Sequence, residues 1–263
     1  MTEPAILLPL IIIFSGALVA ALFGLPWFNR RLTLIQLSCL LALAPLSAFG
    51  LFISFLPDLQ ANLALSSQIN WLPSLGFSAG FYFDSLSGLF ALLITSIGTL
   101  IVIYAGQYFK GDQSAYRFLA YILLFMGAML GLVMAGDVLT LFIFWEGTSI
   151  VSFLLVAYKY KDEVARRGAS KALLITGGGG IALLVGLLFI SYLAGSTKFT
   201  VILDSGDVLR SSVFYPVMLI LVAIGAFTKS AQFPLHIWLP EAMSAPTPAS
   251  AYLHSATMVK AGI

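Results

Sequence analysis

Apolar residues fall in long runs along the whole chain, and short polar segments separate these runs. A helix needs about 20 apolar residues to cross the roughly 30 Å hydrocarbon core of a bilayer. Runs of this kind predict seven spans at 4–25, 32–56, 82–108, 116–135, 138–157, 170–194 and 215–235, and an atypical eighth segment from 241 onward. The runs lack the short alternating pattern of barrel strands. The predicted fold class is therefore all-α: a polytopic membrane helix bundle of about eight transmembrane segments, with the seventh and eighth broken.

The composition supports the same interpretation. Of 263 residues, 60% are hydrophobic and 9% are charged, and the mean hydropathy is +1.02. So few polar residues cannot cover a water-soluble globule of this size, so the lipid bilayer is the first expected partner. The net charge of +2 gives no indication of a nucleic-acid partner, and none is expected. The single cysteine, Cys39, lies in an apolar run and can form no intrachain disulfide.

Basic residues are divided unequally between the two predicted sides of the membrane. One side carries nine of them: Arg30, Arg31, Lys110, Arg117, Lys159, Lys161, Arg166, Arg167 and Lys171. The other side carries Lys198 and Arg210. By the positive-inside rule the first side is cytoplasmic, which places the N-terminus outside. The first run is preceded by Glu3 and not by Lys or Arg, so it is expected to be an uncleaved span and not a signal peptide.

Two opposite charges are predicted at membrane depth. Glu146 lies near the middle of the run 138–157, and Lys229 lies in the second half of 215–235. A charge at the bilayer centre costs at least ~2.5–3.5 kcal/mol, so such residues face protein or water and tend to be functional. A Glu–Lys pair whose separation can change is a proton switch, because the closed pair holds the proton on the lysine and opening releases it. The alternative is a fixed ion pair that joins two helices.

Prolines interrupt the last two segments beside these charges, at positions 234, 240, 246 and 248. Proline removes an amide donor, and broken backbone at membrane depth is tolerated where it is buried in protein or lines a water-filled cavity. The broken segments carry four titratable residues: Lys229, His236, His254 and Lys260. A lone histidine is more often a satisfied interior residue. The cluster favours function, because histidine can relay a proton and discontinuous helices often hold ion sites.

Other features are interpreted more simply. The run Gly177–Gly180 lies within an apolar span and lacks a following Lys-Ser/Thr, so it predicts close helix packing and not a phosphate loop. No cofactor or metal is expected, because the sequence offers no metal-ligand set, cysteine pair or GxGxxG unit. Asp84 and Asp137 lie near predicted membrane faces, as helix-terminal residues or as accessories to transport. Lys171 is either a snorkelling interfacial lysine or the inner end of a proton path.

The segment from Gly225 to Gly262 reads GAFTKSAQFPLHIWLPEAMSAPTPASAYLHSATMVKAG. It resembles the signature of the antiporter-like membrane subunits shared by respiratory complex I, membrane-bound hydrogenases and Mrp-type sodium/proton antiporters. The segment around Trp145-Glu146 and the segment 82–87 match this family as well, so the resemblance covers nearly the whole chain. The sequence KALLIT at 171–176, followed by glycines, is most similar to the large A subunit of Mrp antiporters.

The resemblance implies a role for each matched residue. Glu146 would be the glutamate of the fifth helix that modulates the pair, and Lys229 the proton-carrying lysine of the broken seventh helix. His236, His254 and Lys260 would form a hydrated relay along the membrane midplane. The family fold is an inverted repeat of two five-helix bundles, so residues 1–263 are expected to form a single transmembrane domain that supplies the first. Expected partners are other membrane subunits, and either a separate chain supplies the second half or the sequence is a gene fragment.

The sequence is compatible with three functions, all in the plasma membrane and none enzymatic for this chain itself. The leading hypothesis is an ion-translocating subunit of a multisubunit sodium/proton antiporter. The second is a proton-pumping subunit of complex I or a related hydrogenase, in which other subunits carry the redox chemistry. The third is a truncated membrane scaffold that transports nothing.

Overall fold

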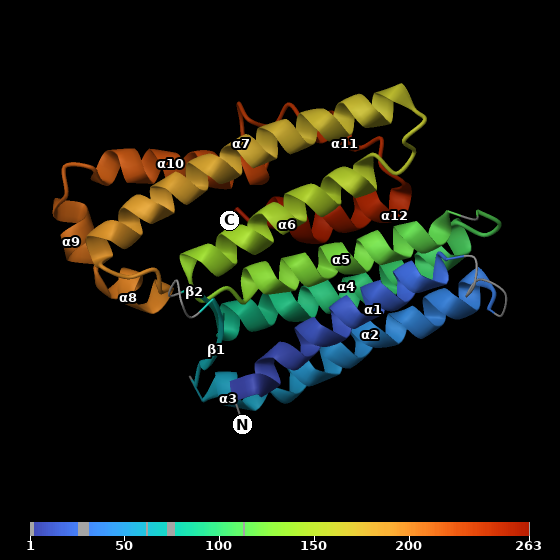
Figure 1. Ribbon diagram of the computed structural model, residues 1–263, viewed down its shortest axis with the longest axis horizontal. Coiled ribbons are helices and arrows are strands. Elements are labelled where there is room, and N and C mark those ends of the chain that lie inside the picture. The colour runs from blue at the N-terminus through green and yellow to red at the C-terminus, as the bar shows by residue number, and fades with distance from the viewer. Residues whose placement is uncertain (1–2, 26–31, 62, 73–76, 113, 263) are drawn as a thin grey trace.

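The computed structural model describes residues 3–25, 32–61, 63–72, 77–112 and 114–262, and six of its helices are long and apolar enough to cross a membrane. These spans lie in α1 (Leu8–Phe23), α2 (Leu34–Ser54), α4 (Ser85–Tyr108), α5 (Ala115–Val133), α6 (Val138–Val156) and α7 (Glu163–Ala194). A 3-10 turn (Glu3–Leu7) precedes α1, and the short helix α3 (Leu56–Gln60) follows α2. Figure 1 shows the six long helices running along the long axis of the molecule. The predicted all-α membrane bundle is confirmed.

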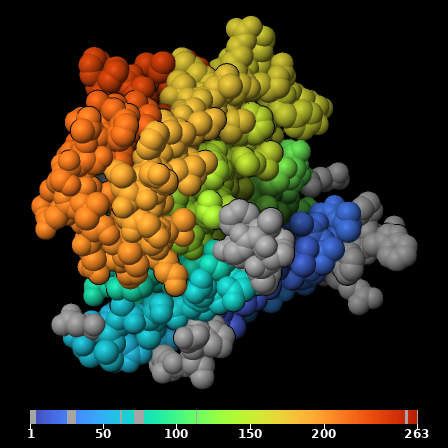
Figure 2. Space-filling model, turned by 60° about the vertical axis from the view of Figure 1, so that its left-hand side comes forward, coloured from blue at the N-terminus to red at the C-terminus, as the bar shows by residue number. Residues whose placement is uncertain are grey.

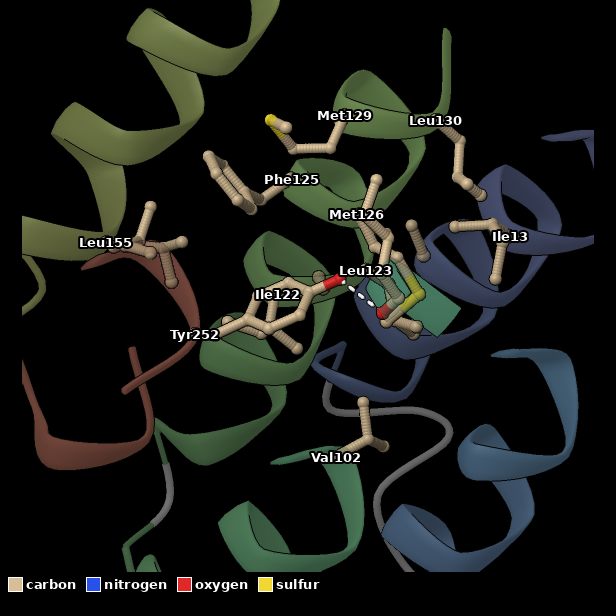
Figure 3. Close-up of a cluster of buried hydrophobic side chains, with 14 of the residues drawn as sticks. Ile13, Val102, Ile122, Leu123, Phe125, Met126, Met129, Leu130, Leu155 and Tyr252 are labelled. Atoms are coloured by element: carbon tan, nitrogen blue, oxygen red, sulfur yellow. Dashed lines mark hydrogen bonds between the residues drawn. The ribbon is translucent and has the colours of Figure 1, made fainter. Parts of the chain in front are cut away.

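The helix α5 lies at the centre of the bundle. Fifteen of its nineteen residues are buried, so it faces protein on all sides, between α1, α4 and α6. Figure 3 shows its Phe125, Met126 and Leu130 in the apolar cluster that also contains Ile13 of α1. The ring of Tyr252 joins this cluster, with its centroid 5.8 Å from that of Phe125. Its hydroxyl donates a 2.9 Å hydrogen bond to the carbonyl of residue 94, which satisfies the one polar atom of a buried ring.

A β-hairpin lies between α3 and α4, in the segment between the predicted spans 32–56 and 82–108. Strands β1 (Leu65–Leu72) and β2 (Phe77–Phe83) pair in antiparallel fashion. The prediction relied on apolar runs of about 20 residues, and this criterion overlooks strands of this length. Backbone hydrogen bonds from Tyr82 to Met134 (2.8 Å) and from Gly136 to Gly80 (2.8 Å) fasten the hairpin to the α5–α6 connection.

Aspartates and a threonine fix where several helices begin. Asp84, Asp137 and Asp162 are the N-caps of α4, α6 and α7, and each side chain accepts a hydrogen bond from a backbone N–H of the first turn. Thr33 and Gln36 form a capping box at the start of α2. The span predicted at 170–194 is therefore part of a longer helix, because the cap at Asp162 starts α7 before the apolar run begins.

The seventh segment is shorter than predicted. Helix α10 (Tyr215–Lys229) ends six residues before the predicted boundary at 235. Ala231 has a left-handed backbone with φ of 50°, which stops the helix ahead of Pro234. The eighth segment consists of α11 (Leu239–Ala242), α12 (Thr247–Ser250), a π-helix (Ala251–Thr257) and a 3-10 turn (Met258–Lys260). Both segments are broken, as predicted, while a total of eight spans stays a prediction.

The connections gather at two opposite ends of the bundle. Figure 1 shows the hairpin and the short helices α8 (Phe199–Asp204) and α9 (Gly206–Ser211) at the left end, and the α6–α7 connection at the right end. This division agrees with the two sides derived from the basic residues. Arg30, Arg31 and Ile263 lie outside the described residues. The orientation with the N-terminus outside stays a prediction.

Candidate functional site

Lys229 ends α10 with its side chain fully buried, at 0% exposure. The ammonium Nζ donates hydrogen bonds to the backbone carbonyl of Trp145 at 3.0 Å and to the hydroxyl of Ser149 at 2.7 Å. It also lies 5.2 Å from the centre of the Trp145 ring. Its position at the C-terminus of α10 adds the favourable field of the last carbonyls. A desolvated cation is thus held against α6 by neutral acceptors.

Glu146 is the next residue along α6, and its carboxylate turns toward α7. A Cβ atom added to Gly180 would collide with the Oε1 atom of Glu146, and one added to Gly177 would lie 3.8 Å from Oε2. The Oε1 atom is buried and has no hydrogen-bond partner among the described residues. Glu146 and Lys229 interact electrostatically. The ion pairs within 4.0 Å in the described part of the chain do not include this pair. The Lys229 ammonium and the Glu146 carboxylate therefore lie at the same level of α6, but they do not form a direct ion pair.

The glycine run permits this arrangement. A Cβ on Gly179 would lie 2.6 Å from Cβ of Thr228, the residue before Lys229. A Cβ on Gly225 of α10 would lie 2.9 Å from the carbonyl oxygen of Gly179. The two helices touch backbone to backbone at this level, as the sequence predicted. The glycine run has a second effect that was not predicted, because glycine at positions 177 and 180 leaves room for the Glu146 carboxylate.

His254 lies in the π-helix, close to this site. Its Nδ1 and Nε2 atoms are both buried and form no hydrogen bond of good geometry among the residues that the structure describes, although the imidazole interacts with the backbone of Ala242. Its ring centroid is 6.1 Å from that of Trp238, whose Nε1 donates a 2.9 Å hydrogen bond to the carbonyl of Thr228. Trp238 therefore connects the imidazole to the end of α10. Buried polar groups normally find a partner, so a ring nitrogen of His254 that lacks one indicates a place for water.

The other two relay candidates, His236 and Lys260, lie apart from Glu146, Lys229 and His254. His236 is exposed, and its ring centroid is 5.7 Å from that of Phe233. Lys260 is exposed at the hairpin end of the bundle, where it lines a cavity of about 380 Å³ together with Asp84 and Thr257. The structure thus groups Glu146, Lys229 and His254 in the interior, and it does not bring His236 or Lys260 into contact with them.

Lys171 forms an ion pair with Glu241 of α11. Their side chains are 38% and 44% exposed, so the pair lies at the surface of the chain, where such contacts add little stability. A Cβ on Gly168 would lie 2.6 Å from the carbonyl oxygen of Glu241, so α11 sits directly on α7. Glu241 was not among the predicted site residues. The available signal was an acid directly after Pro240, inside a broken apolar segment.

Asp137 has a structural role in this geometry. Its Oδ1 accepts from the backbone N–H of Thr140 at 2.8 Å, and its Oδ2 accepts from the N–H of Gly80 at 2.5 Å and the hydroxyl of Thr140 at 2.8 Å. The side chain therefore caps α6 and holds the hairpin on it. Asp84 caps α4 through the N–H of Ser87 at 2.8 Å.

These features define a multi-pass membrane protein with ionisable groups in its interior. The family described as "NADH:quinone oxidoreductase/Mrp antiporter, TM" matches residues 135–263. The family described as "NADH-Ubiquinone oxidoreductase (complex I), chain 5 N-terminus" matches residues 71–119. The chain belongs to the antiporter-like membrane subunits that these complexes share. It is a multi-pass protein of the plasma membrane.

Curated relatives of this chain are named as antiporter subunits. The A/B subunit of a probable K(+)/H(+) antiporter of Rhizobium meliloti is 45% identical over 256 residues, which is 95% of this chain and 24% of that protein. The A subunit of the Na(+)/H(+) antiporter of Alkalihalophilus pseudofirmus is 45% identical over 240 residues, covering 91% of this chain and 30% of that protein. The chain thus spans about a quarter to a third of the length of these relatives.

Two solved structures have the same arrangement of helices. The Mrp complex from Dietzia sp. DQ12-45-1b aligns with a TM-score of 0.85 and 32% identity, over 98% of this chain and 27% of that one. The membrane-bound sulfane sulfur reductase, an archaeal respiratory membrane complex, aligns with a TM-score of 0.79 and 21% identity, over 99% of this chain and 39% of that one. The second likeness shows the fold alone.

Proposed function

We propose that residues 1–263 are a single transmembrane domain of an ion-translocating subunit in a multisubunit monovalent cation/proton antiporter. The observation that carries this proposal is Lys229, a fully buried cation held on neutral acceptors next to Glu146, whose Oε1 has no hydrogen-bond partner among the described residues. The relatives named as antiporter subunits support the assignment, and the subunits of their assemblies indicate further membrane subunits as partners here.

The ammonium group of Lys229 occupies two alternative positions in this mechanism. In one, its ammonium rests on Ser149 and the Trp145 carbonyl, as the structure has it. In the other, it moves onto the Glu146 carboxylate and forms a direct ion pair. The Ser149 hydroxyl suits a proton carrier, because it can accept from an ammonium and donate to a neutral amine. A fixed ion pair would instead keep the lysine on the carboxylate.

His254 is the next group on the proposed path. The proton released by Lys229 passes through water to one ring nitrogen of His254, and the other ring nitrogen releases a proton further along. Lys260 and Asp84 then lie at the hairpin end of the bundle, where they line one cavity. We assign the Lys171–Glu241 pair to the opposite end, where it holds α11 against α7. We place His236 on the path at the exposed face of the chain.

A second candidate is a proton-pumping membrane subunit of NADH:quinone oxidoreductase. The match of residues 71–119 to the N-terminal part of a complex I chain favours it. Both candidates use the same buried charges, so the partners decide between them. Purification of the native complex separates the two, since iron–sulfur and quinone-site subunits would accompany the chain in one case and small antiporter subunits in the other.

The test of proton carriage is Lys229→Arg beside Lys229→Ala. Arginine keeps the positive charge, but with a pKa above ~12 it cannot release a proton in a working cycle. Vesicles containing the assembled complex are energised with a pH gradient, and its dissipation on adding Na⁺ or K⁺ is recorded. We expect both variants to be inserted in the membrane but to fail to dissipate the pH gradient when the cation is added. Near-normal activity of Lys229→Arg would overturn proton carriage and would assign Glu146 and Lys229 a structural role only.

A further inference from the structure

A basic hollow lies at the start of α7, away from the site described above. It has a volume of about 610 Å³, and all its lining residues belong to one face of this helix: Glu163, Arg166, Arg167, Ser170, Lys171, Leu174 and Ile175. In Figure 2 the yellow segment that contains the start of α7 projects at the top of the molecule. The hollow is open, so its occupant lies beside the helix and is not enclosed by the protein.

The length of α7 places this hollow at a membrane boundary. At about 1.5 Å per residue, a helix of this length measures roughly 48 Å, well beyond a hydrocarbon core of about 30 Å. Its first turns carry the charged residues, so we expect this end of the helix to lie at headgroup level. The change from charged to apolar residues occurs inside the hollow, between Lys171 and Leu174. Leu174 is 76% exposed, so an apolar contact surface begins directly below the charges.

The same face of α7 stays exposed and apolar along its length. Leu174, Ile181 and Leu188 follow one another at intervals of seven residues, and all three are exposed. Tyr192 continues the face at the far end of the helix, where an aromatic residue suits the opposite interface. An acyl chain that starts in the hollow would therefore find apolar contacts all the way across its own leaflet.

The charges in the hollow are positive on balance. Arg166, Arg167 and Lys171 oppose the carboxylate of Glu163, and the Glu241 carboxylate faces Lys171 from α11. Each cation already has one protein partner: the Tyr160 carbonyl for Arg166, Glu163 for Arg167 and Glu241 for Lys171. A guanidinium has five N–H donors, so both arginines keep donors for a further acceptor. Arginine in this geometry suits the oxygens of a phosphate group.

We propose that this hollow binds the headgroup of an anionic phospholipid, with the acyl chains lying along Leu174 and Ile181. A phosphodiester carries one negative charge and several acceptor oxygens, which matches two guanidiniums with free donors. The apolar face directly below separates this ligand from a soluble phosphate, which has nothing to place there. The site stands apart from proton carriage and does not depend on it.

The experiment measures lipid selectivity on the assembled complex in bilayer discs of phosphatidylcholine. Spin-labelled phosphatidylglycerol and spin-labelled phosphatidylcholine are added in turn, and the motionally restricted fraction gives the relative association constant. We expect the unmodified protein to prefer phosphatidylglycerol several-fold. Since about 1 kcal/mol per basic residue near the surface corresponds to roughly fivefold in association, the double variant Arg166→Gln with Arg167→Gln should remove most or all of this preference.

The matched control is Lys159→Gln with Lys161→Gln. It removes the same charge from the adjacent α6–α7 connection, and neither lysine lines the hollow. This control should keep most of the preference. Equal losses in the two double variants would overturn the proposal in favour of a diffuse surface potential. Full displacement of the labelled lipid by inorganic phosphate, at constant ionic strength, would overturn the lipid in favour of a soluble anion. An absence of phosphatidylglycerol preference in the unmodified complex would overturn it too.

Discussion

Replacing Gly180 with alanine tests whether the glycines of α7 set the position of the Glu146 carboxylate. The added Cβ would collide with Oε1 of Glu146, and it would lie 3.1 Å from the carboxyl carbon and 3.2 Å from Cδ1 of Trp145. The carboxylate has to turn away, since the Trp145 ring belongs to a buried side chain. Gly178, two residues earlier, has nothing within 4 Å of the equivalent position. The same substitution there adds a methyl group in open space.

The two alanine variants should differ in stability. Overpacking a well-filled site costs about 1–3 kcal/mol, and alanine gains about 1 kcal/mol over glycine in a helix. Gly178→Ala should therefore raise the free energy of unfolding by up to about 1 kcal/mol. The free energy of unfolding of Gly180→Ala should be about 1–3 kcal/mol lower than that of Gly178→Ala. At about 2–4 °C per kcal/mol, the melting temperatures should differ by at least about 2 °C.

The functional effect should be larger than the effect on stability. A displacement of about 1 Å at a reacting group can cost on the order of 100-fold in rate. We expect Gly180→Ala to dissipate a pH gradient at least about tenfold more slowly when the cation is added. The rate of Gly178→Ala should be unchanged. Adding Glu146→Asp to Gly180→Ala shortens the side chain and should restore part of the activity. Equal activity and equal melting temperature of the two alanine variants would refute the idea that Gly180 positions the carboxylate.

Three further outcomes follow from the contacts. Ser149→Ala removes the hydroxyl that holds Lys229, so transport should fall, whereas Ser149→Thr keeps a hydroxyl and should retain more of it in the same vesicle assay. Asp137→Ala removes the cap of α6 and its link to the hairpin, so the melting temperature of the purified protein should fall by the equivalent of about 1–2 kcal/mol. In a Cys39→Ser background, an impermeant thiol reagent added outside the cell should modify Gln68→Cys and not Lys161→Cys. The reverse labelling would overturn the predicted orientation.

The long helices were predictable because a bilayer imposes one length and one composition on every span. That criterion identified α1, α2 and α4 to α7, although the start of α7 was placed too late because its cap at Asp162 lies outside the apolar run. The hairpin was missed because its strands satisfy their backbone groups by pairing with each other. Nothing in that pairing requires a long apolar run.

The charged residues of the site were predictable and their partners were not, for a physical reason. Glu146 and Lys229 stand out in the sequence because a charge at membrane depth is costly whatever surrounds it. The acceptors of Lys229 are a backbone carbonyl, which every residue has, and the hydroxyl of Ser149, which resembles any other serine in a helix. The collision that an alanine at Gly180 would cause depends on the register between α6 and α7, which the residue types alone do not determine. A sequence can therefore indicate that a buried charge is functional, while its direct contacts depend on how neighbouring helices are aligned.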